Sequence, residues 1–325
     1  MGNTWTQFFP PAPQFTEKNL ADLFGKVFIV TGSNTGIGKE VARMLYSVNA
    51  KVYIAARSEE KSRKAISDIQ TAYPSSKGSL IFLHLDLADL TTIKATVDEF
   101  LNKESKLHVL FNNAGVMSVP TIPDRTVQGY EMNLGVNNVG TFLLTKLLTP
   151  VLISTARTEP ANTVRVVWVS STIDLAGAKH VGVPLDDLDF HKRKVPGMER
   201  YGLSKTGSWL HAVEYAKLHE ADGIVCMPVN PGNLNSELGR EHTRFVQWIL
   251  RFIVHPVYLG AYSLLFAGLS PEITIEKSGS FIWPWGRFGT VRQDLVAATK
   301  SEAESGNGNA KKFWDWTEEQ IEKYV

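Results

Sequence analysis

The chain has little cysteine, no excess of charge and no tract of low complexity. Cys226 is the single cysteine among 325 residues, which excludes an internal disulfide, and it lies in the apolar run 224–229, where we expect it to fill core space. Lys and Arg number 34 against 33 Asp and Glu, so the net charge of +1 provides no field that would attract nucleic acid. We therefore expect a cytoplasmic protein without a nucleic-acid partner.

No segment has the composition of a secretion signal or of an uninterrupted membrane span. Polar residues and three prolines interrupt the first residues, which show no basic region followed by an apolar one. Gly2 followed by Thr6 matches the loose N-myristoylation pattern, a match that often arises by chance, so acylation of Gly2 stays open. The apolar stretch 245–269 is interrupted at Arg251 and Pro256. It is better explained by helices that cover a substrate, and peripheral membrane contact stays open.

The histidines and carboxylates form no recognisable metal site. None of the 8 histidines belongs to a His-Glu-x-x-His arrangement, and one cysteine excludes a thiolate cluster, so we predict no metal. Asp186, Asp187 and Asp189 are close in sequence, but a solvated loop explains them better than paired carboxylate catalysis. The histidines expected at the surface or in a lid are His180, His191 and His242.

The middle of the chain contains no Pro/Gly/Ser-rich linker, which predicts one domain in spite of the length of the chain. A hydrophobic content of 43% supports a sizeable core. We assign residues 1–20 to an N-terminal extension and residues 21–325 to a single domain. Segments near 172–200 and 236–270 are expected to cover the substrate.

Short apolar runs rich in β-branched and aromatic residues alternate with longer segments of helical spacing. The runs are 27–30, 52–55, 80–85, 109–111, 164–169, 224–229 and 281–283. Strand followed by helix, repeated, predicts an α/β fold: a Rossmann-type doubly wound parallel sheet of about seven strands with helices on both faces. Such sheets bind ligands beyond the carboxyl ends of their strands, where the strand order reverses.

A glycine turn follows the first run. In Thr31-Gly32-Ser33-Asn34-Thr35-Gly36-Ile37-Gly38, missing side chains would let the backbone approach a pyrophosphate at the N-terminus of the helical segment 39–48. A glycine cluster alone is equally compatible with a tight strand-to-helix turn. Its place after the first strand favours a bound dinucleotide.

The second run ends in Ala55-Ala56-Arg57-Ser58, without an Asp or Glu that would bind a ribose 2′-hydroxyl. Arg57 is placed to bind a 2′-phosphate through its charge and its planar fork of donors, so NADP (NADPH) is favoured over NAD. The alternative is a surface arginine that begins the charged helix 58–64. Asp86 and Leu87, after the third run, would lie near the adenine in such a sheet.

Tyr201 and Lys205 lie four residues apart in the predicted helix 200–218, and therefore on one face of it. A nearby ammonium favours phenolate over phenol, so we expect the pKa of Tyr201 to fall from about 10 toward working pH, where the residue acts as general acid or base. Together with the upstream glycine turn, this pair indicates a hydride-transfer enzyme.

Several motifs occur in one order over nearly the whole chain. They are the Thr31–Gly38 turn, Asn112-Asn113-Ala114-Gly115, Asn137, Ser170-Ser171, Tyr201-x-x-x-Lys205 and Pro231-Gly232. With these motifs the chain resembles the short-chain dehydrogenase/reductase family. It is most similar to the retinol-dehydrogenase-like and WW-domain-oxidoreductase-like branch common in fungi, through residues 34–39, 136–140 and 283–286, although no WW domain is present.

The resemblance implies a role for each matching residue. Tyr201 would be the general acid/base, Lys205 would bind the nicotinamide ribose and lower the tyrosine pKa, Ser171 would hydrogen-bond the substrate oxygen, and Asn137 would hold a water beside the lysine. The cofactor would also be bound by Asn113, Ala114 and Gly115 beside the adenine ribose, and by Pro231, Gly232 and Leu234 at the carboxamide. Taken singly, each residue also fits a structural role, and the set in order favours catalysis.

The sequence departs from the family pattern at Ser33 and Asn34, where some NADP-preferring relatives carry a basic residue, so Arg57 would act alone and the preference could be partial. The long loop 179–200 and the aromatic residues near 245–269 favour a bulky lipophilic substrate, such as a retinoid, steroid, polyketide or terpenoid carbonyl. Core packing explains the same aromatics nearly as well. They are Trp248, Phe252, Tyr258 and Phe266.

The leading function is therefore an NADP-dependent carbonyl reductase or alcohol dehydrogenase of secondary metabolism, acting on a lipophilic small molecule. The alternative is a catalytically silent dinucleotide sensor or partner-binding module on the same fold. Helices 125–153 and 200–218 would pair subunits in many relatives, so a homodimer stays open.

Overall fold

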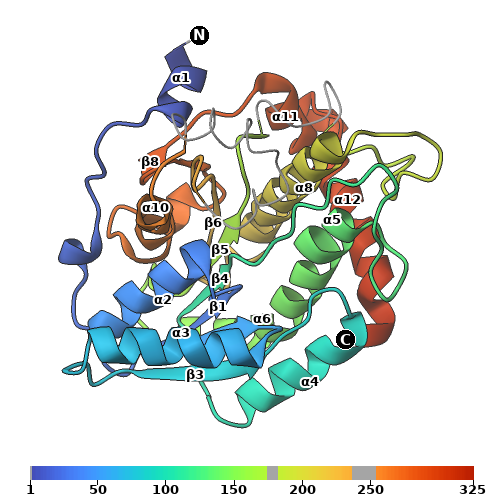
Figure 1. The fold of residues 1–325 in the computed structure, drawn as a ribbon. Coiled ribbons are helices and arrows are strands. Elements are labelled where there is room, and N and C mark those ends of the chain that lie inside the picture. The colour runs from blue at the N-terminus through green and yellow to red at the C-terminus, as the bar shows by residue number, and fades with distance from the viewer. Residues whose placement is uncertain (1, 174–181, 236–253) are drawn as a thin grey trace.

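The computed structural model describes residues 2–173, 182–235 and 254–325. Its centre is a sheet whose strands follow the order β3-β2-β1-β4-β5-β6-β7-β8 in the described part of the chain (Figure 1). All neighbouring strands are parallel except the last pair. The strands are β1 (Val27–Thr31), β2 (Lys51–Ala56), β3 (Ser79–His84), β4 (Val109–Asn112), β5 (Arg165–Val169), β6 (Val225–Val229), β7 (Ile282–Trp283) and β8 (Arg287–Phe288). The predicted doubly wound α/β fold is confirmed.

Helices cover both faces of this sheet (Figure 1). Those of the first half are α1 (Gly2–Phe8), η1 (Glu17–Asn19), α2 (Gly36–Ser47), α3 (Glu59–Ala72), α4 (Leu90–Leu101), α5 (Met132–Leu134), the π-helix η2 (Gly135–Gly140) and α6 (Thr141–Ala156). Those of the second half are α8 (Gly197–Leu218), α10 (Val257–Leu269), η4 (Ile275–Lys277), α11 (Gln293–Ala298), η5 (Glu302–Glu304), α12 (Asn309–Ile321) and η6 (Glu322–Tyr324).

The two faces of the sheet build two separate hydrophobic clusters. Successive residues of a strand point to opposite faces, so Val27 and Ile29 of β1 join one cluster with α4, α6 and α8. Phe28 and Val30 join the other with α2 and α10. Because helices cover both faces, the central strands β1, β4, β5 and β6 are buried throughout and lack the alternation of a half-exposed sheet.

The strand order reverses between β1 and β4. Chain segments leave these two neighbouring strands in opposite directions, which opens a crevice at their carboxyl ends. The glycine turn follows β1 and the Asn113–Gly115 segment follows β4. The fold therefore brings these two predicted motifs to the same crevice.

The secondary structure differs from the sequence expectations at two places. The predicted helix 125–153 begins only at Met132, and its first full turn is the π-helix η2. The antiparallel strand β8 was not expected, because two residues are too few to show a pattern; it pairs with β7 after a turn in which Trp285 and Gly286 have φ of 70° and 87°.

The continuous helical stretch Met132–Ala156 is the one among the described residues that is long and apolar enough to cross a membrane. Of its most apolar window, 67% is buried inside the protein, which is the behaviour of a core helix. The C-terminal helix α12 also contributes to this core: Phe313 stacks on His211 of α8 with ring centroids 4.4 Å apart. In Figure 1, α12 lies beside α8 and covers it on the side away from the sheet.

Candidate active site

The glycine turn closes tightly around its own backbone. Gly32 and Gly36 have φ of 65° and 59°, values that favour glycine. A Cβ added to Gly38 would lie 2.7 Å from the Gly32 carbonyl oxygen and 2.6 Å from Nδ2 of Asn113, so this position excludes a side chain. The turn therefore keeps the backbone bare at the start of α2.

The N-terminus of α2 fits an anionic group. The helix begins at Gly36. The side chain of Thr35, the residue before it, makes no capping hydrogen bond to the first turn. Backbone N–H groups in a first helical turn have no partner within the helix and bind phosphate well. The side chain of Ser33 does not join them: it is buried, and its hydroxyl donates to the Val30 carbonyl at 2.6 Å.

Thr31 fastens the segment after β4 to the glycine turn. Its Oγ1 accepts a hydrogen bond from the Ala114 amide at 2.8 Å, while Nδ2 of Asn113 donates to the Thr31 carbonyl at 2.8 Å. Gly115 follows directly, and a Cβ there would lie 3.0 Å from Nζ of Lys205 and 3.2 Å from Oδ1 of Asn137. The predicted cofactor residues after β4 thus border the predicted catalytic ones.

Arg57 follows β2 with an exposed side chain. Among the described residues no hydrogen bond or ion pair engages its guanidinium group. Asp86 follows β3, and its Oδ1 accepts from the Ala88 amide at 2.9 Å. Leu87 is buried, with its backbone so close to η2 that a Cβ on Gly140 would lie 2.3 Å from the Leu87 carbonyl oxygen. Contacts of these residues with a dinucleotide stay predictions.

Tyr201 and Lys205 lie on one face of α8, as their spacing predicts. Nζ of Lys205 is 5.9 Å from the centre of the Tyr201 ring and donates to the Val169 carbonyl at 3.0 Å. Only 4% of Lys205 is exposed, and this burial lowers its pKa to about 8. The ammonium is therefore held beside the ring at the end of β5.

The pKa of Tyr201 moves opposite to the sequence expectation. The residue keeps some accessible surface, but the protein packed around it raises its pKa to about 12, and a hydrogen bond from the Ser171 hydroxyl opposes that rise. Burial disfavours the phenolate charge, and Lys205 is itself desolvated. In the protein without a bound ligand, Tyr201 therefore carries its proton at neutral pH.

The two serines after β5 meet α8 at two points. Ser171 hydrogen-bonds Tyr201, and Ser170 donates its hydroxyl proton to the Lys205 carbonyl at 2.7 Å. Ser170 is 2% exposed, so its hydroxyl serves this internal contact. The serine pair thus fixes the end of β5 against the helix that carries Tyr201.

Asn137 lies in the π-helix η2, and its side chain is fully engaged. Its Oδ1 accepts from the Val116 amide at 2.8 Å, and its Nδ2 donates to the Val116 carbonyl at 3.0 Å and to Oγ of Ser204 at 2.9 Å. The side chain therefore joins the segment after β4 to α8. Single π-helical turns inside α-helices are frequent at functional sites. The predicted water beside Lys205 is not tested.

The segment after β6 carries the residues predicted to receive a carboxamide. Pro231 is buried, and Gly232 has a φ of 91°. The Gly232 amide donates to Oδ1 of Asn230 at 3.0 Å. Leu234 forms an isolated parallel bridge with His255. Contacts with Asn230 and His255 thus hold this segment at the carboxyl end of the sheet.

A buried ion pair next to Tyr201 had no counterpart among the predicted residues. Nε of Arg200 lies 3.1 Å from Oε1 of Glu131, with side chains 2% and 0% exposed. Glu131, which precedes α5, also accepts from the Leu134 amide in that helix, and Arg200 donates to the Pro120 carbonyl. Arg200 precedes Tyr201 directly, but nothing in the sequence connects it with a glutamate 69 positions earlier.

The acidic group at 186–189 is solvated at Asp186, whose side chain is 72% exposed, but not at Asp187 and Asp189. Asp187 is 6% exposed and accepts hydrogen bonds from the amides of Lys192 and Arg193. Asp189 accepts from the Glu131 amide at 2.5 Å and pairs with Arg125. Backbone N–H groups that the loop turns inward require acceptors, and these carboxylates supply them. His191, in contrast, has an exposed side chain that pairs with Asp189.

The aromatic residues expected around the substrate divide between core and surface. Phe266 is 3% exposed and packs against Phe15 of the N-terminal extension, so it belongs to the core. Tyr258, at the start of α10, is 43% exposed. Trp248, Phe252, His180 and His242 lie outside the described residues.

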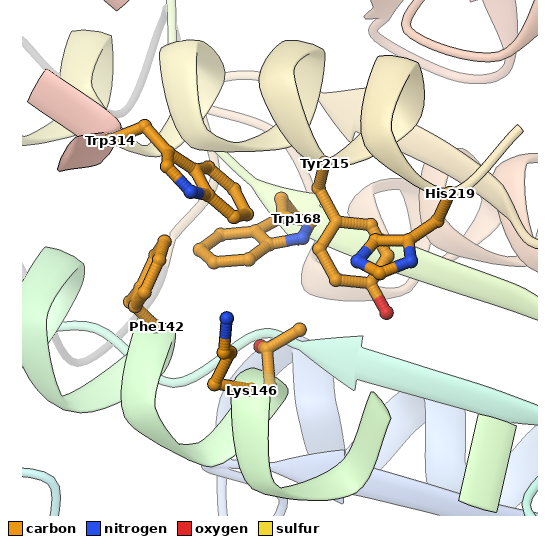
Figure 2. Close-up of a pocket in the computed structure, with 7 residues that line it drawn as sticks. Phe142, Lys146, Trp168, Tyr215, His219 and Trp314 are labelled. Atoms are coloured by element: carbon orange, nitrogen blue, oxygen red, sulfur yellow. The ribbon is translucent and has the colours of Figure 1, made fainter. Parts of the chain in front are cut away.

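Figure 2 shows a small hollow that is separate from this site. It lies between α6, α8 and α12 and is lined mainly by aromatic rings, with Lys146 at one side. Tyr215 of α8 and His219 just after it line the hollow, and at a rise of about 1.5 Å per residue Tyr215 lies roughly 20 Å along the helix from Tyr201. No group of three His, Cys, Asp or Glu side chains converges in the described segments.

Comparison with known proteins identifies similar chains. The sequence profile of the short chain dehydrogenase family matches residues 26–183. A short-chain dehydrogenase/reductase of Phomopsis amygdali is 51% identical over 99% of this chain and 97% of its own, and one of Neocamarosporium betae is 49% identical over 100% and 94%.

Solved structures share the fold. An uncharacterized protein from Mycobacterium paratuberculosis has a TM-score of 0.67 and 27% identity, covering 94% of this chain and 96% of its own. An NADPH-bound short chain oxidoreductase from Pseudomonas aeruginosa PAO1, with an atypical catalytic center, has a TM-score of 0.63 and 22% identity over 81% of this chain and 96% of its own.

Proposed function

The chain belongs to the short-chain dehydrogenase/reductase family of NAD(P)-dependent enzymes, and from that premise we propose that it is an NADP-dependent oxidoreductase. It interconverts a carbonyl and an alcohol on a lipophilic small molecule, with Tyr201 as general acid/base. The observation that carries the proposal is that Ser171, Tyr201 and Lys205 come together. Ser171 hydrogen-bonds Tyr201, and the ammonium of Lys205 lies beside the same ring.

The dinucleotide would be held by the bare glycine turn, the Asn113–Gly115 segment and the Pro231–Leu234 segment. The open backbone at Gly36 supports this assignment, because a Cβ added there would meet no atom within 4 Å. A bound nicotinamide supplies or accepts the hydride. Lys205, whose ammonium is available at neutral pH because its pKa is about 8, would bind the ribose next to that ring.

The chain's own residues would then handle the proton. Tyr201 donates its phenolic proton to the substrate oxygen in the reductive direction, and the Ser171 hydroxyl donates a hydrogen bond to that oxygen. Two donors aimed at developing negative charge stabilise it more than water does. The phenol carries its proton at neutral pH, as the acid in the reductive direction must.

The preference for NADP is supported by Arg57. Its exposed guanidinium has no partner in the described part of the chain, and no acidic residue ends β2 to bind a 2′-hydroxyl. A lipophilic substrate is supported by Met198, which is 52% exposed and lies three residues before Tyr201 on the same face of α8.

Purified protein should consume NADPH with at least one apolar ketone or aldehyde from a panel. Tyr201→Phe should reduce turnover by about 10²–10⁴-fold with NADPH affinity nearly unchanged, because only the proton donor is lost. Tyr73→Phe, at the end of α3, is the matched control and should keep wild-type turnover. A Tyr201→Phe variant with full rate would refute the acid/base role.

Cofactor preference is tested separately. Arg57→Ala should raise the KM for NADPH by roughly 10–100-fold, the effect of losing a charge-assisted hydrogen bond, and leave the KM for NADH unchanged. Arg63→Ala, an exposed arginine of α3, should change neither. An unaltered ratio of the two KM values in Arg57→Ala rejects the phosphate role. Cofactor binding without turnover across the panel would favour the silent binding module instead.

A further inference from the structure

The N-terminal helix α1 is fastened to the end of the molecule that carries the catalytic groups. Figure 1 shows it beside β8 and above α10, at the edge of the sheet. Arg287 of β8 donates to the Thr6 carbonyl at 2.6 Å, and Nε2 of His255 donates to the Phe8 carbonyl at 2.9 Å. Both contacts join residues more than 240 positions apart. Docking of α1 is therefore a tertiary feature of the folded chain.

One side chain of α1 reaches further inward. Gln7 is 2% exposed, and its Oε1 accepts a hydrogen bond from Nδ2 of Asn230 at 3.0 Å. Burying an amide costs free energy unless it is hydrogen-bonded, so a glutamine in this place is kept for the contact it makes. Asn230, 1% exposed, is the residue between β6 and Pro231.

Asn230 connects the two loops that the proposed reaction uses. Its Nδ2 also donates to Oγ1 of Thr172 at 3.1 Å, next to Ser171, and its Oδ1 accepts from the Gly232 amide at 3.0 Å. Both amide protons of Asn230 are thus used, one by Gln7 and one by Thr172. Because the Gly232 amide can only donate and Gln7 Oε1 can only accept, these two contacts together fix which way the Asn230 amide faces.

We propose that Gln7 is a positioning residue of the active site, acting through Asn230 on the Ser171–Thr172 segment and on the Pro231–Leu234 segment. This inference rests on the proposed function. Without the Gln7 acceptor, one buried amide proton of Asn230 has no partner, and the amide that bonds both Thr172 and Gly232 is held less firmly. The N-terminal extension is then a working part of the site.

The test compares full-length Gln7→Leu, which keeps the volume and removes the acceptor, with Gln14→Leu. Gln14 lies exposed in the same extension and makes no hydrogen bond within the described residues, so it matches the chemical change without the contact. With a carbonyl that the wild type reduces, Gln7→Leu should lower kcat by at least about tenfold and raise the NADPH dissociation constant several-fold, while Gln14→Leu does neither.

Hydrogen exchange in the cofactor-free protein gives a readout without catalysis. The Gly232 amide should exchange faster in Gln7→Leu and at the wild-type rate in Gln14→Leu. Gln7→Glu, which keeps an oxygen at the same reach, should restore much of the protection. If Gln7→Leu does not fold, Gln7→Asn, too short to reach Asn230, takes its place.

The outcomes separate the two proposals. A lower melting temperature with unchanged kcat, NADPH affinity and Gly232 exchange would make Gln7 a stability residue and overturn the inference. If the wild type reduces no carbonyl, the proposed function fails, yet NADPH affinity and exchange at Gly232 still decide whether Gln7 acts on this segment.

Discussion

The two halves of the crevice are built by different means. On the cofactor side, Thr31, Asn113 and Gly38 are themselves members of the predicted set, and they hold one another through backbone atoms and short side chains. On the reaction side, Tyr201 and Ser171 depend on residues outside every motif, namely the Glu131–Arg200 pair and Gln7. The residues of a motif can therefore be positioned by contacts within the motifs or by contacts from residues in distant parts of the chain.

The largest effect on stability should come from breaking the buried Glu131–Arg200 pair. Arg200→Met should lower the free energy of unfolding by about 3–5 kcal/mol, because it leaves the Glu131 carboxylate buried without its counter-ion. Urea denaturation measures this change. Lys146→Met breaks an exposed pair with Glu318 and should cost less than about 1 kcal/mol. Equal losses in the two variants would show that the buried pair is not a special support.

The cofactor side should respond to a single methyl group. Gly38→Ala inserts a Cβ within 2.7 Å of the Gly32 carbonyl oxygen and of Nδ2 of Asn113, so we expect a loss of about 1–3 kcal/mol in the free energy of unfolding. NADPH affinity should fall with it, since the turn must widen, and fluorescence titration measures that affinity. Unchanged NADPH affinity in Gly38→Ala would remove the glycine turn from the cofactor site.

The reaction side should also contain a residue that lowers stability. Lys205 has its pKa lowered to about 8 by burial, so the unfolded chain binds its proton more tightly than the folded chain does. Stability from this group therefore rises as the pH increases from about 8 to about 10.5. At pH 7 the charged form opposes folding.

Lys205→Met should consequently stabilise the cofactor-free protein by roughly 2–3 kcal/mol at pH 7, and by about 1 kcal/mol or less at pH 10. Melting temperatures at the two pH values measure the difference. Lys61→Met, on the exposed face of α3, should show no such pH dependence. A gain that is equal at both pH values would mean that charge burial is not its cause.

The smallest effect concerns the tie between the glycine turn and the segment after β4. Thr31→Val removes the acceptor for the Ala114 amide and should cost about 1 kcal/mol of stability. NADPH should bind a few-fold more weakly. Thr71→Val, on the exposed side of α3, is the comparison and should be close to neutral. If Thr31→Val changes neither stability nor NADPH affinity, the hydrogen bond from Ala114 to Thr31 does not hold the cofactor side together.

The sequence predicts much of the fold because the strands from β1 to β7 coincide with apolar runs, and each of their observed boundaries falls within one or two residues of the expected one. Motif residues also come together as predicted, since the carboxyl ends of parallel strands share an edge. The π-helix at Asn137 could not be foreseen, because its backbone register depends on tertiary contacts with Val116 and Ser204.

Contacts between residues far apart in the chain could not be predicted from the sequence either. Gln7 lies in a segment that was assigned only as an extension, and its partner is 223 positions away. The lowered tyrosine pKa was predicted from spacing alone, whereas burial of both Tyr201 and Lys205 decides the direction. Spacing gives neighbours along a helix, but desolvation depends on everything packed around them.

The position of α12 has a consequence for synthesis of the chain. Phe313, Trp314 and Ile321 close the outer side of α8, yet the ribosome makes them after every strand of the sheet. Until α12 has been made, the apolar outer side of α8 stays exposed in the nascent chain. Chaperones can bind this surface during that time. Mutations that remove α12 should show themselves first as aggregation during expression.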